Sequence, residues 1–387
     1  MKAAAVALIA FSAVNAVVGS TSCPMAPRPG DPLRGLTREE LTRFEQGREV
    51  FERKFTPETG LGPLFNGDAC AECHEDPVAG GTGDEVEVHV AMLRPGGFCD
   101  PLADQGGPVI QQEVTPALKA ALGIDHEPIP PEANARAART PPDLFGFGLL
   151  DAVPDREILA LADPDDRNHD GVSGRPNRFT DGRLGRFGRK AFVPTLAEFN
   201  HGAFVVEQGI TNPAVPTEES IGGKAIPAGV DPVPEPELTE RDLELADDFV
   251  RFLAPPAQMP LDQEGELGRS IFGTIGCAGC HVPSLTTGAS PVRALSYQTV
   301  HAYTDLLLHD MGPGRADICL GLAAPSEFRT EPLMGLRLLK SFLHDGKAKS
   351  IDEAVRLHDG EAAGARARYA RLPSARRAAL LRFLNSL

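Results

Sequence analysis

The stretch NGDACAECH, residues 66–74, has two cysteines separated by two residues, with a histidine directly after the second. The same C-x-x-C-H spacing returns in GCAGCH, residues 276–281. Covalent attachment of a haem c needs two thiols that meet the vinyl groups of the porphyrin and a histidine that reaches the iron. The repeated motif therefore predicts two covalent haems. Their attachment residues and proximal ligands are Cys70, Cys73 and His74 for the first, and Cys277, Cys280 and His281 for the second.

Two other chemistries use closely spaced cysteines. A zinc site would have to join two pairs from opposite halves of the chain, and it would not require a histidine after each pair. A thioredoxin-like redox pair has no reason to occur twice with that histidine. Haem attachment is the interpretation that accounts for both copies.

The surroundings of the motif are repeated as well. Gly-Arg-x-aliphatic-Phe precedes each copy, at 47–51 and 268–272, an Arg-Thr-x-Pro loop follows each, and each half closes on a similar apolar segment. This pattern predicts two modules of one ancestry. We expect a mainly α protein of two cytochrome c-like domains with long loops and few short strands, over residues 32–255 and 256–387.

Local signals place several elements. Capping-box-like pairs predict helices that begin after Thr37, Thr239 and Ser350. The clearest strand is EVEVHVAML, residues 85–93, because its apolar residues alternate with polar ones. The Pro-rich segment 222–238 is predicted to be an extended connection.

The N-terminus has the layout of a secretory signal peptide over residues 1–22, with Lys2 followed by an apolar run and then small residues. We therefore expect export to the periplasm. Cys23 follows without the branched aliphatic residue that a lipoprotein signal usually carries, so we do not expect a lipid anchor there. No later window is long and apolar enough to predict a membrane span.

Charge and cysteine content limit the partners. A net charge of −16 argues against nucleic acid or anionic lipid, and it favours a cationic redox protein as electron donor. Of the seven cysteines, three lie outside the C-x-x-C-H units. An oxidising compartment permits a bridge between Cys99 and Cys319, but the sequence does not assign it.

Further blocks accompany the two motifs in a fixed order. They lie at residues 60–74, 139–155, 162–179, 185–191, 207–213, 268–285, 303–317 and 328–355. With these blocks the chain resembles the bacterial di-haem oxidoreductase family, whose members are described as peroxidases or thiol oxidoreductases. That family is related to the di-haem cytochrome c peroxidases and to the di-haem enzyme that matures tryptophan tryptophylquinone.

The resemblance implies a haem-dependent oxidoreductase, in which the N-terminal haem meets an oxidant such as peroxide. The C-terminal haem would relay electrons from an external donor. The alternative is an electron-transfer cytochrome with both irons six-coordinate. A thiol oxidoreductase is less well supported, because no further cysteine pair is dedicated to that chemistry.

The resemblance also suggests the distal ligands. His358, on the helix that begins after Ser350, stands at the place of the distal ligand of the second haem, and Met311 is the alternative. His89 stands close to the displaceable ligand of the first haem. Its strand setting equally suits a histidine with no role at the iron.

Candidate proton-transfer groups lie in the segment that matches the catalytic glutamate of the relatives. They are Glu198, Glu207 and His201, and the sequence does not choose between the two glutamates. The relatives place a tryptophan between the haems as an electron conduit. This chain contains no tryptophan, and Arg189 stands where we would look for an aromatic residue.

Residues 165–174 resemble the first half of a calcium-binding loop. Asp166, Asn168 and Asp170 alternate before Gly171, which supplies oxygen ligands and a tight turn. The bidentate glutamate of such loops is missing, since Asn177 stands at its place. The pattern predicts either a Ca²⁺ site or a plain acidic turn.

Overall fold

The computed structural model describes residues 26–387. The predicted signal peptide and Cys23 lie outside this range. Helices account for 33% of the structure and strands for 13%, so long loops carry much of the chain, as expected. The longer helices are α1 (Arg38–Phe51), α6 (Leu196–Gln208), α7 (Glu240–Phe252), α8 (Gln263–Thr274) and α11 (Ser374–Leu384).

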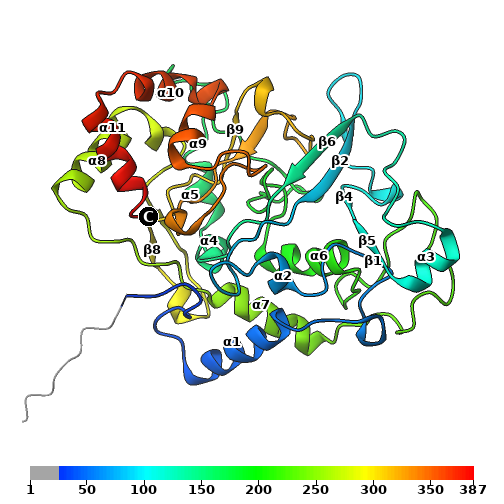
Figure 1. The fold of residues 1–387 in the computed structure, drawn as a ribbon. Helices are drawn as coiled ribbons and strands as arrows, with labels where there is room; N and C mark the ends of the chain where they lie inside the picture. The colour runs from blue at the N-terminus through cyan, green and yellow to red at the C-terminus, as the bar shows by residue number, and fades with distance from the viewer. Residues whose placement is uncertain (1–25) are drawn as a thin grey trace, which may run out of the picture.

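The shorter elements lie between these helices. The shorter helices are α2 (Cys70–Cys73), α3 (Pro116–Leu122), α4 (Phe147–Asp151), α5 (Asp155–Leu159), α9 (Ile351–Leu357) and α10 (Ala363–Ala370). Figure 1 shows α1, α2, α6 and α7 in its lower part and α8 to α11 at the upper left. No helix within residues 26–387 combines the length and the apolar character needed to cross a bilayer.

Helix α1 packs against α7 in the first half of the chain. Thr37 caps α1 in a full capping box with Glu40, and the Thr239 side chain caps α7, as the sequence predicts. The helices approach closely at Gly47, where an added Cβ would lie 2.0 Å from the carbonyl oxygen of Leu245. Glycine is therefore required at this contact by close approach of the backbone.

Helix α8 packs against α11 in the second half in the same way. A Cβ at Gly268 would lie 2.0 Å from the carbonyl oxygen of Ala379. The two glycines occupy the same place in the sequence repeat, so both halves use one helix contact. This pairing repeats a structural unit; the division near residue 255 into two cytochrome c-like domains stays a prediction.

A small antiparallel sheet is built around β2 (Glu87–Leu93), inside the predicted strand 85–93. Its neighbours are β3 (Cys99–Asp100), β4 (Val109–Ile110) and β6 (Ala135–Arg139). The other strands form two-stranded pairs: β1 (Leu64–Phe65) with β5 (Glu113–Val114), β7 (Leu285–Thr286) with β8 (Thr299–Val300), and β9 (Leu308–Asp310) with β10 (Glu327–Arg329).

The largest hydrophobic core crosses residue 255. It joins Phe44 and Phe249 of the first half to Leu295 and Leu307 of the second. A separate core around Phe272, Tyr369 and Phe383 belongs to the second half alone. Cys99 and Cys319 form a disulfide that also links the halves, so the bridge that the sequence permits is present.

Two candidate haem sites

The first C-x-x-C-H unit lies on the single turn of α2, and His74 ends that turn. His74 Nδ1 lies 3.1 Å from the carbonyl oxygen of Gly81. Burial lowers the pKa of His74, so the ring is neutral at pH 7. A neutral imidazole with Nδ1 held by a backbone carbonyl keeps Nε2 for a metal, which is the usual arrangement of a histidine ligand.

The second unit lies on a 3₁₀ turn, Cys277–Gly279, and its histidine is held in the same way. His281 Nδ1 lies 2.9 Å from the carbonyl oxygen of Tyr303, and burial lowers the pKa of His281 to about 4. Phe272 of α8 packs against this ring at 6.4 Å, as Phe51 of α1 packs against His74 at 6.2 Å. Both halves therefore present a histidine of equivalent setting.

A second imidazole faces His281. The rings of His281 and His358 have their centroids 6.5 Å apart, and His358 Nδ1 lies 2.7 Å from the carbonyl oxygen of Ala354. Metal–imidazole bonds of about 2 Å on each side would separate two such rings by roughly 6 Å. Both Nδ1 atoms lie against backbone carbonyl oxygens, so each ring keeps Nε2 for a metal, and His281 and His358 are the residues that would hold one ion between them. Met311 lies after β9, where its amide donates to Ser326.

The four thiols of the motifs are not activated. Burial raises the pKa of Cys70 and of Cys277 to about 12, and it raises the pKa of Cys73 and Cys280 as well. A redox-active cysteine reacts as a thiolate, which these environments disfavour. In the part of the chain that the structure describes, no three Cys or His donors gather as a metal-ligand group. The residues therefore fit thioether attachment better than either alternative.

Glu207 lies beside the first motif. Its Oε2 accepts a hydrogen bond of 2.8 Å from Asn66 Nδ2, and its charge contributes to the raised pKa of the Cys73 thiol. Burial, followed by the charge of Glu87, raises the pKa of Glu207 well above its usual range. A partly buried carboxyl group that can hold a proton therefore adjoins the first site.

The other two candidates on α6 lie elsewhere. Glu198 is at the opposite end of the helix, where Arg183 and the Thr195 side chain hold it near the surface, and these contacts lower its pKa. His201 Nε2 lies 2.8 Å from Asp247 Oδ2 of α7. The structure thus brings one of the three candidates, Glu207, to a C-x-x-C-H unit.

His89 is paired within its own strand. Its Nε2 lies 2.9 Å from Glu87 Oε2, and the two residues share a face of β2 because they are two positions apart. Burial lowers the pKa of His89, whereas the contact with His89 outweighs burial and lowers the pKa of Glu87. A neutral His89 therefore donates from Nε2 to an ionised carboxylate. No other imidazole makes a ring contact with His74 in residues 26–387.

His309 is a residue of the second site that sequence reasoning does not single out. Its Nδ1 and Nε2 each lie 2.8 Å from a carboxylate, of Glu361 and Asp305, and Nδ1 lies 3.5 Å from Cys280 Sγ. Burial opposes the charge, but these hydrogen bonds raise the pKa of His309 to about 12. A buried imidazolium therefore adjoins the second motif. Glu361 is distant from His309 in the sequence, and no local sequence pattern predicts their contact.

Arg189 stands at the position where the resemblance led us to look for an aromatic electron conduit. It lies in a polar network. Its guanidinium pairs with Glu331 at 2.8 Å and donates to the carbonyl oxygen of Thr140. A buried pair of cations, Arg139 and Lys190, holds Asp317 nearby. Residues from both halves of the chain therefore meet through ion pairs in this region.

The calcium-like loop binds its own backbone. Asp166 Oδ1 accepts hydrogen bonds from the amides of Asp170 and Gly171, and Asp170 Oδ1 accepts one from Val172. Asn168 donates to the second oxygen of Asp170. These contacts hold the turn by themselves, and a Ca²⁺ ion at Asp166, Asn168 and Asp170 stays a prediction.

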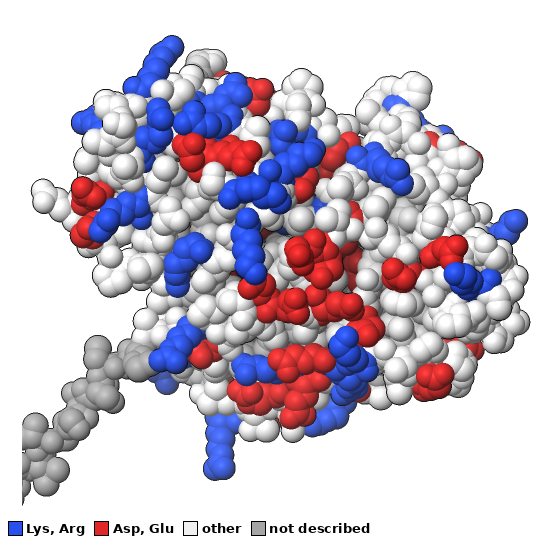
Figure 2. All heavy atoms as spheres, viewed as in Figure 1, with Lys and Arg blue, Asp and Glu red and all other residues white. Residues whose placement is uncertain are grey.

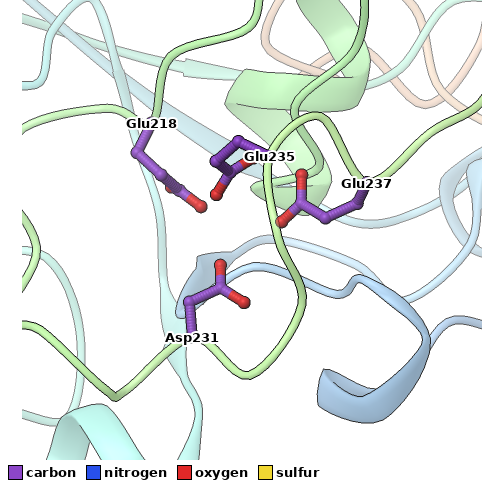
Figure 3. A group of neighbouring side chains, drawn as sticks. All are labelled: Glu218, Asp231, Glu235 and Glu237. Carbon is purple, nitrogen blue, oxygen red and sulfur yellow. The ribbon is translucent and has the colours of Figure 1, made fainter.

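Figure 3 shows four carboxylates that converge, Glu218 together with Asp231, Glu235 and Glu237 of the Pro-rich connection. One oxygen of each lies within 4.8 Å of the others. Burial, followed by a hydrogen bond with Asp231, raises the pKa of Glu218 to about 10, and the pKa of Glu237 is raised to about 8. Glu218 therefore holds a proton that it can donate to Asp231, and this proton reduces the repulsion within the group.

Residues 134–387 match the family described as "Di-haem oxidoreductase, putative peroxidase". The matched region contains the second C-x-x-C-H unit, and the first lies before it. A comparison with curated protein sequences gives no match.

Several solved structures are similar at low identity. Hydrazine synthase of Kuenenia stuttgartiensis is 14% identical, with 98% of this chain and 100% of that chain covered and a TM-score of 0.44. The di-haem peroxidase BthA of Burkholderia thailandensis is 16% identical, with coverages of 94% and 93% and a TM-score of 0.42. A MauG-like protein associated with microbial copper homeostasis is 15% identical, with coverages of 95% and 95% and a TM-score of 0.41.

Proposed function

The chain belongs to the di-haem oxidoreductase family, and from this premise we propose that it is an exported enzyme that reduces peroxide with two covalently attached haems. The first haem, at Cys70, Cys73 and His74, would be the reactive one. The second, at Cys277, Cys280 and His281, would pass on electrons from an external donor.

One difference between the two sites carries this proposal. His281 is faced by His358 at 6.5 Å between ring centroids, whereas the ring contact of His74 is with Phe51. A strong ligand on each side of an iron favours electron transfer, and an open side admits an oxidant. The residues therefore support an electron-relay role for the second site and a reactive role for the first.

Haem iron, when bound, supplies the binding position for peroxide and the change of oxidation state. Peroxide reduction also needs a group that takes a proton from one oxygen and returns it to the other as the O–O bond breaks. Glu207 is suited to that task, because its partly buried carboxyl group has a raised pKa and adjoins the first motif. Asn66 holds one of its oxygens and so fixes the direction of the carboxyl group.

The alternative, an electron-transfer cytochrome with two six-coordinate irons, has His89 as its first candidate ligand at the first iron. The Nε2 of His89 is bonded to Glu87. Ligation through this nitrogen would leave the partly buried Glu87 carboxylate without this hydrogen bond, which is costly. The pairing of His89 with Glu87 therefore supports an open first site.

The test compares Glu207→Gln with Glu198→Gln, two isosteric changes on one helix. Each protein is loaded with haem, its haem content is measured, and turnover of hydrogen peroxide is followed with a chemical electron donor. Loss of a general acid–base group typically lowers kcat about 10²- to 10⁴-fold. We expect such a loss in Glu207→Gln and less than a twofold change in Glu198→Gln.

Equal turnover in the two variants would remove Glu207 from the mechanism. Absence of peroxide turnover in the wild-type protein with full haem content would overturn the proposed activity. Export is tested separately, by locating the protein after cell fractionation in a bacterial host. Retention in the cytoplasm would contradict that part of the proposal.

A further inference from the structure

Charge is distributed very unevenly along this acidic chain. Residues 362–387 contain no Asp or Glu, although the whole protein has a net charge of −16. Their basic residues are Arg366, Arg368, Arg371, Arg376, Arg377 and Arg382. Figure 2 shows Lys and Arg gathered at the upper left, where Figure 1 places α8 to α11, and Asp and Glu concentrated lower on the same face.

Four of these arginines make no ion pair with a carboxylate in the described part of the chain. They are Arg368, Arg371, Arg376 and Arg377, which we call the arginine face. The other two are neutralised, Arg366 by Asp359 and Arg382 by Asp262. The arginine face therefore carries positive charge with no carboxylate at ion-pair distance among the described residues.

Contacts within the arginine face hold it together. Arg377 donates to the carbonyl oxygens of Ala370 and Leu372, on either side of Arg371, and its guanidinium lies 5.4 Å from the ring of Tyr369. Tyr369 is fully buried and belongs to the core of the second half. Arg371 and Arg376 are exposed. The segment that carries these arginines is therefore packed against the core of the second half.

The arginine face adjoins the second C-x-x-C-H unit. Arg368 Nε donates to the carbonyl oxygen of Ile275 at 2.8 Å, two residues before Cys277. Its guanidinium also lies against Gly276, where an added Cβ would be 2.6 Å from Nη2. Residues 270–292 around this motif carry no Asp, Glu, Lys or Arg. The arginine face therefore places positive charge next to the second C-x-x-C-H unit, in a segment that has no charged residue of its own.

We propose that the arginine face is the docking surface for an acidic electron-transfer protein, which delivers electrons to the second haem. This inference rests on the proposed function and names the partner of its relay site. Each encounter would transfer one electron, so that the donor centre is oxidised and the second iron is reduced from the ferric to the ferrous state.

Complementary charge speeds protein association and orients the partners. The net negative charge of the whole chain strengthens this orientation, because it repels an acidic partner from surfaces where Asp and Glu predominate. Net charge alone favours a cationic donor. The local charge beside the second site favours an acidic one instead.

The test uses a reduced plant-type [2Fe–2S] ferredoxin as an acidic donor and the haem-loaded full chain as acceptor. Stopped-flow spectroscopy measures the second-order rate of haem reduction at several salt concentrations. The variant is Arg371→Glu with Arg376→Glu. The control, Arg38→Glu with Lys119→Glu, changes the net charge equally on α1 and α3, which Figure 1 places far from α10 and α11.

We expect the arginine-face variant to lose about tenfold in rate with ferredoxin at low salt and the control less than twofold. The wild-type rate should fall with added salt, and the variant should show little salt dependence. Reduction by the small cation methyl viologen should change less than twofold in both. Equal rates for variant and control, or a wild-type rate independent of salt, would overturn the proposal.

Two further measurements keep the outcomes separate. Arg371→Gln with Arg376→Gln removes the charge without reversing it, and its loss of rate should lie between those of the wild-type protein and the charge-reversed variant. It replaces the charge-reversed variant if that protein folds poorly. Calorimetric titration with oxidised ferredoxin measures docking without turnover. Binding that depends on the arginines, in a protein without peroxide turnover, would uphold the docking surface and overturn only the proposed activity. Peroxide turnover with a chemical donor, but no binding of ferredoxin, would uphold the proposed activity and overturn only the docking surface.

Discussion

The two C-x-x-C-H regions share a scaffold and differ in almost everything around it. Each has a histidine anchored through Nδ1, a phenylalanine against its ring and a glycine at the helix contact. Around the first, residues 55–93 contain eight acidic residues and no Lys or Arg: Glu58, Asp68, Glu72, Glu75, Asp76, Asp84, Glu85 and Glu87. Arginines adjoin the second, and a second imidazole faces its histidine.

This difference shows how one unit can be given two tasks. The shared parts hold a cofactor in place, and they do not determine what its iron does. The role of the iron is determined by its surroundings, which are the imidazole of His358 at the second site, the carboxyl group of Glu207 at the first, and the charge near each. Function is therefore read from the surroundings of the motif.

The largest expected effect concerns two histidines bonded to carboxylates, His309 beside the second motif and His89 in the region of the first. His309→Gln removes a buried imidazolium and leaves Asp305 and Glu361 uncompensated, which should lower the free energy of unfolding by about 3–5 kcal/mol. His89→Gln removes a neutral partner of Glu87 and should cost about 1 kcal/mol. Denaturant unfolding of both variants gives the comparison.

Equal losses in the two variants would mean that His309 is not the charged member of the pair. His89→Gln also tests the first iron. An altered haem spectrum in this variant would restore His89 as a ligand and weaken the contrast between the regions.

The next effect is on redox potential. His358→Met should raise the potential of the second haem by on the order of 0.1 V, because a thioether favours the reduced iron and axial ligands span roughly 0.8 V. The first haem should be unaffected. Spectroelectrochemical titration resolves both, and an unchanged second potential would remove His358 as the facing ligand.

A smaller effect tests the shared scaffold. Gly47→Ala and Gly268→Ala should each destabilise by about 1–3 kcal/mol, because the added Cβ meets a backbone carbonyl at 2.0 Å. Gly273→Ala on α8 is the control, since nothing lies within 4 Å of its Cβ. It should stabilise by about 0.5–1 kcal/mol through helix propensity. Losses that differ widely between Gly47→Ala and Gly268→Ala would show that the halves do not share one helix contact.

The smallest effect belongs to the acidic cluster of the first half. Burial and neighbouring carboxylates raise the folded-state pKa of Glu218 to about 10, above its usual value. Its contribution to stability is therefore present at acid pH and is lost as the pH rises toward 10. Glu218→Gln should weaken this decline and stabilise the protein by about 1 kcal/mol at pH 9.

The control for the cluster is Glu264→Gln in the second half, where the side chain is 74% exposed. Thermal unfolding from pH 5 to pH 10 should show the same slope in this variant as in the wild-type protein. A parallel slope in Glu218→Gln would contradict the account of the cluster.

The elements predicted correctly from the sequence are those that depend on local sequence patterns. The helix starts at Thr37, Thr239 and Ser350, the strand β2 and the irregular Pro-rich connection are all present in the structure. Capping and alternation act over a few residues, so a single chain displays them.

Contacts between distant segments were less accessible. Glu198 and Glu207 share one helix and could not be separated without the fold, which places only Glu207 beside the first motif. The pairing of His309 with Glu361 joins segments with no shared signal. The bond between His89 and Glu87 was not predicted either, although alternation puts both residues on one face of the strand.

The most direct test of the contrast counts carbon monoxide bound by the reduced, haem-loaded protein. An open iron binds the gas, and an iron held by two imidazoles does not. The account predicts one carbon monoxide for every two haems in the wild-type protein and two in His358→Ala. Binding of two molecules, or of none, by the wild-type protein would contradict the division of tasks between the two regions.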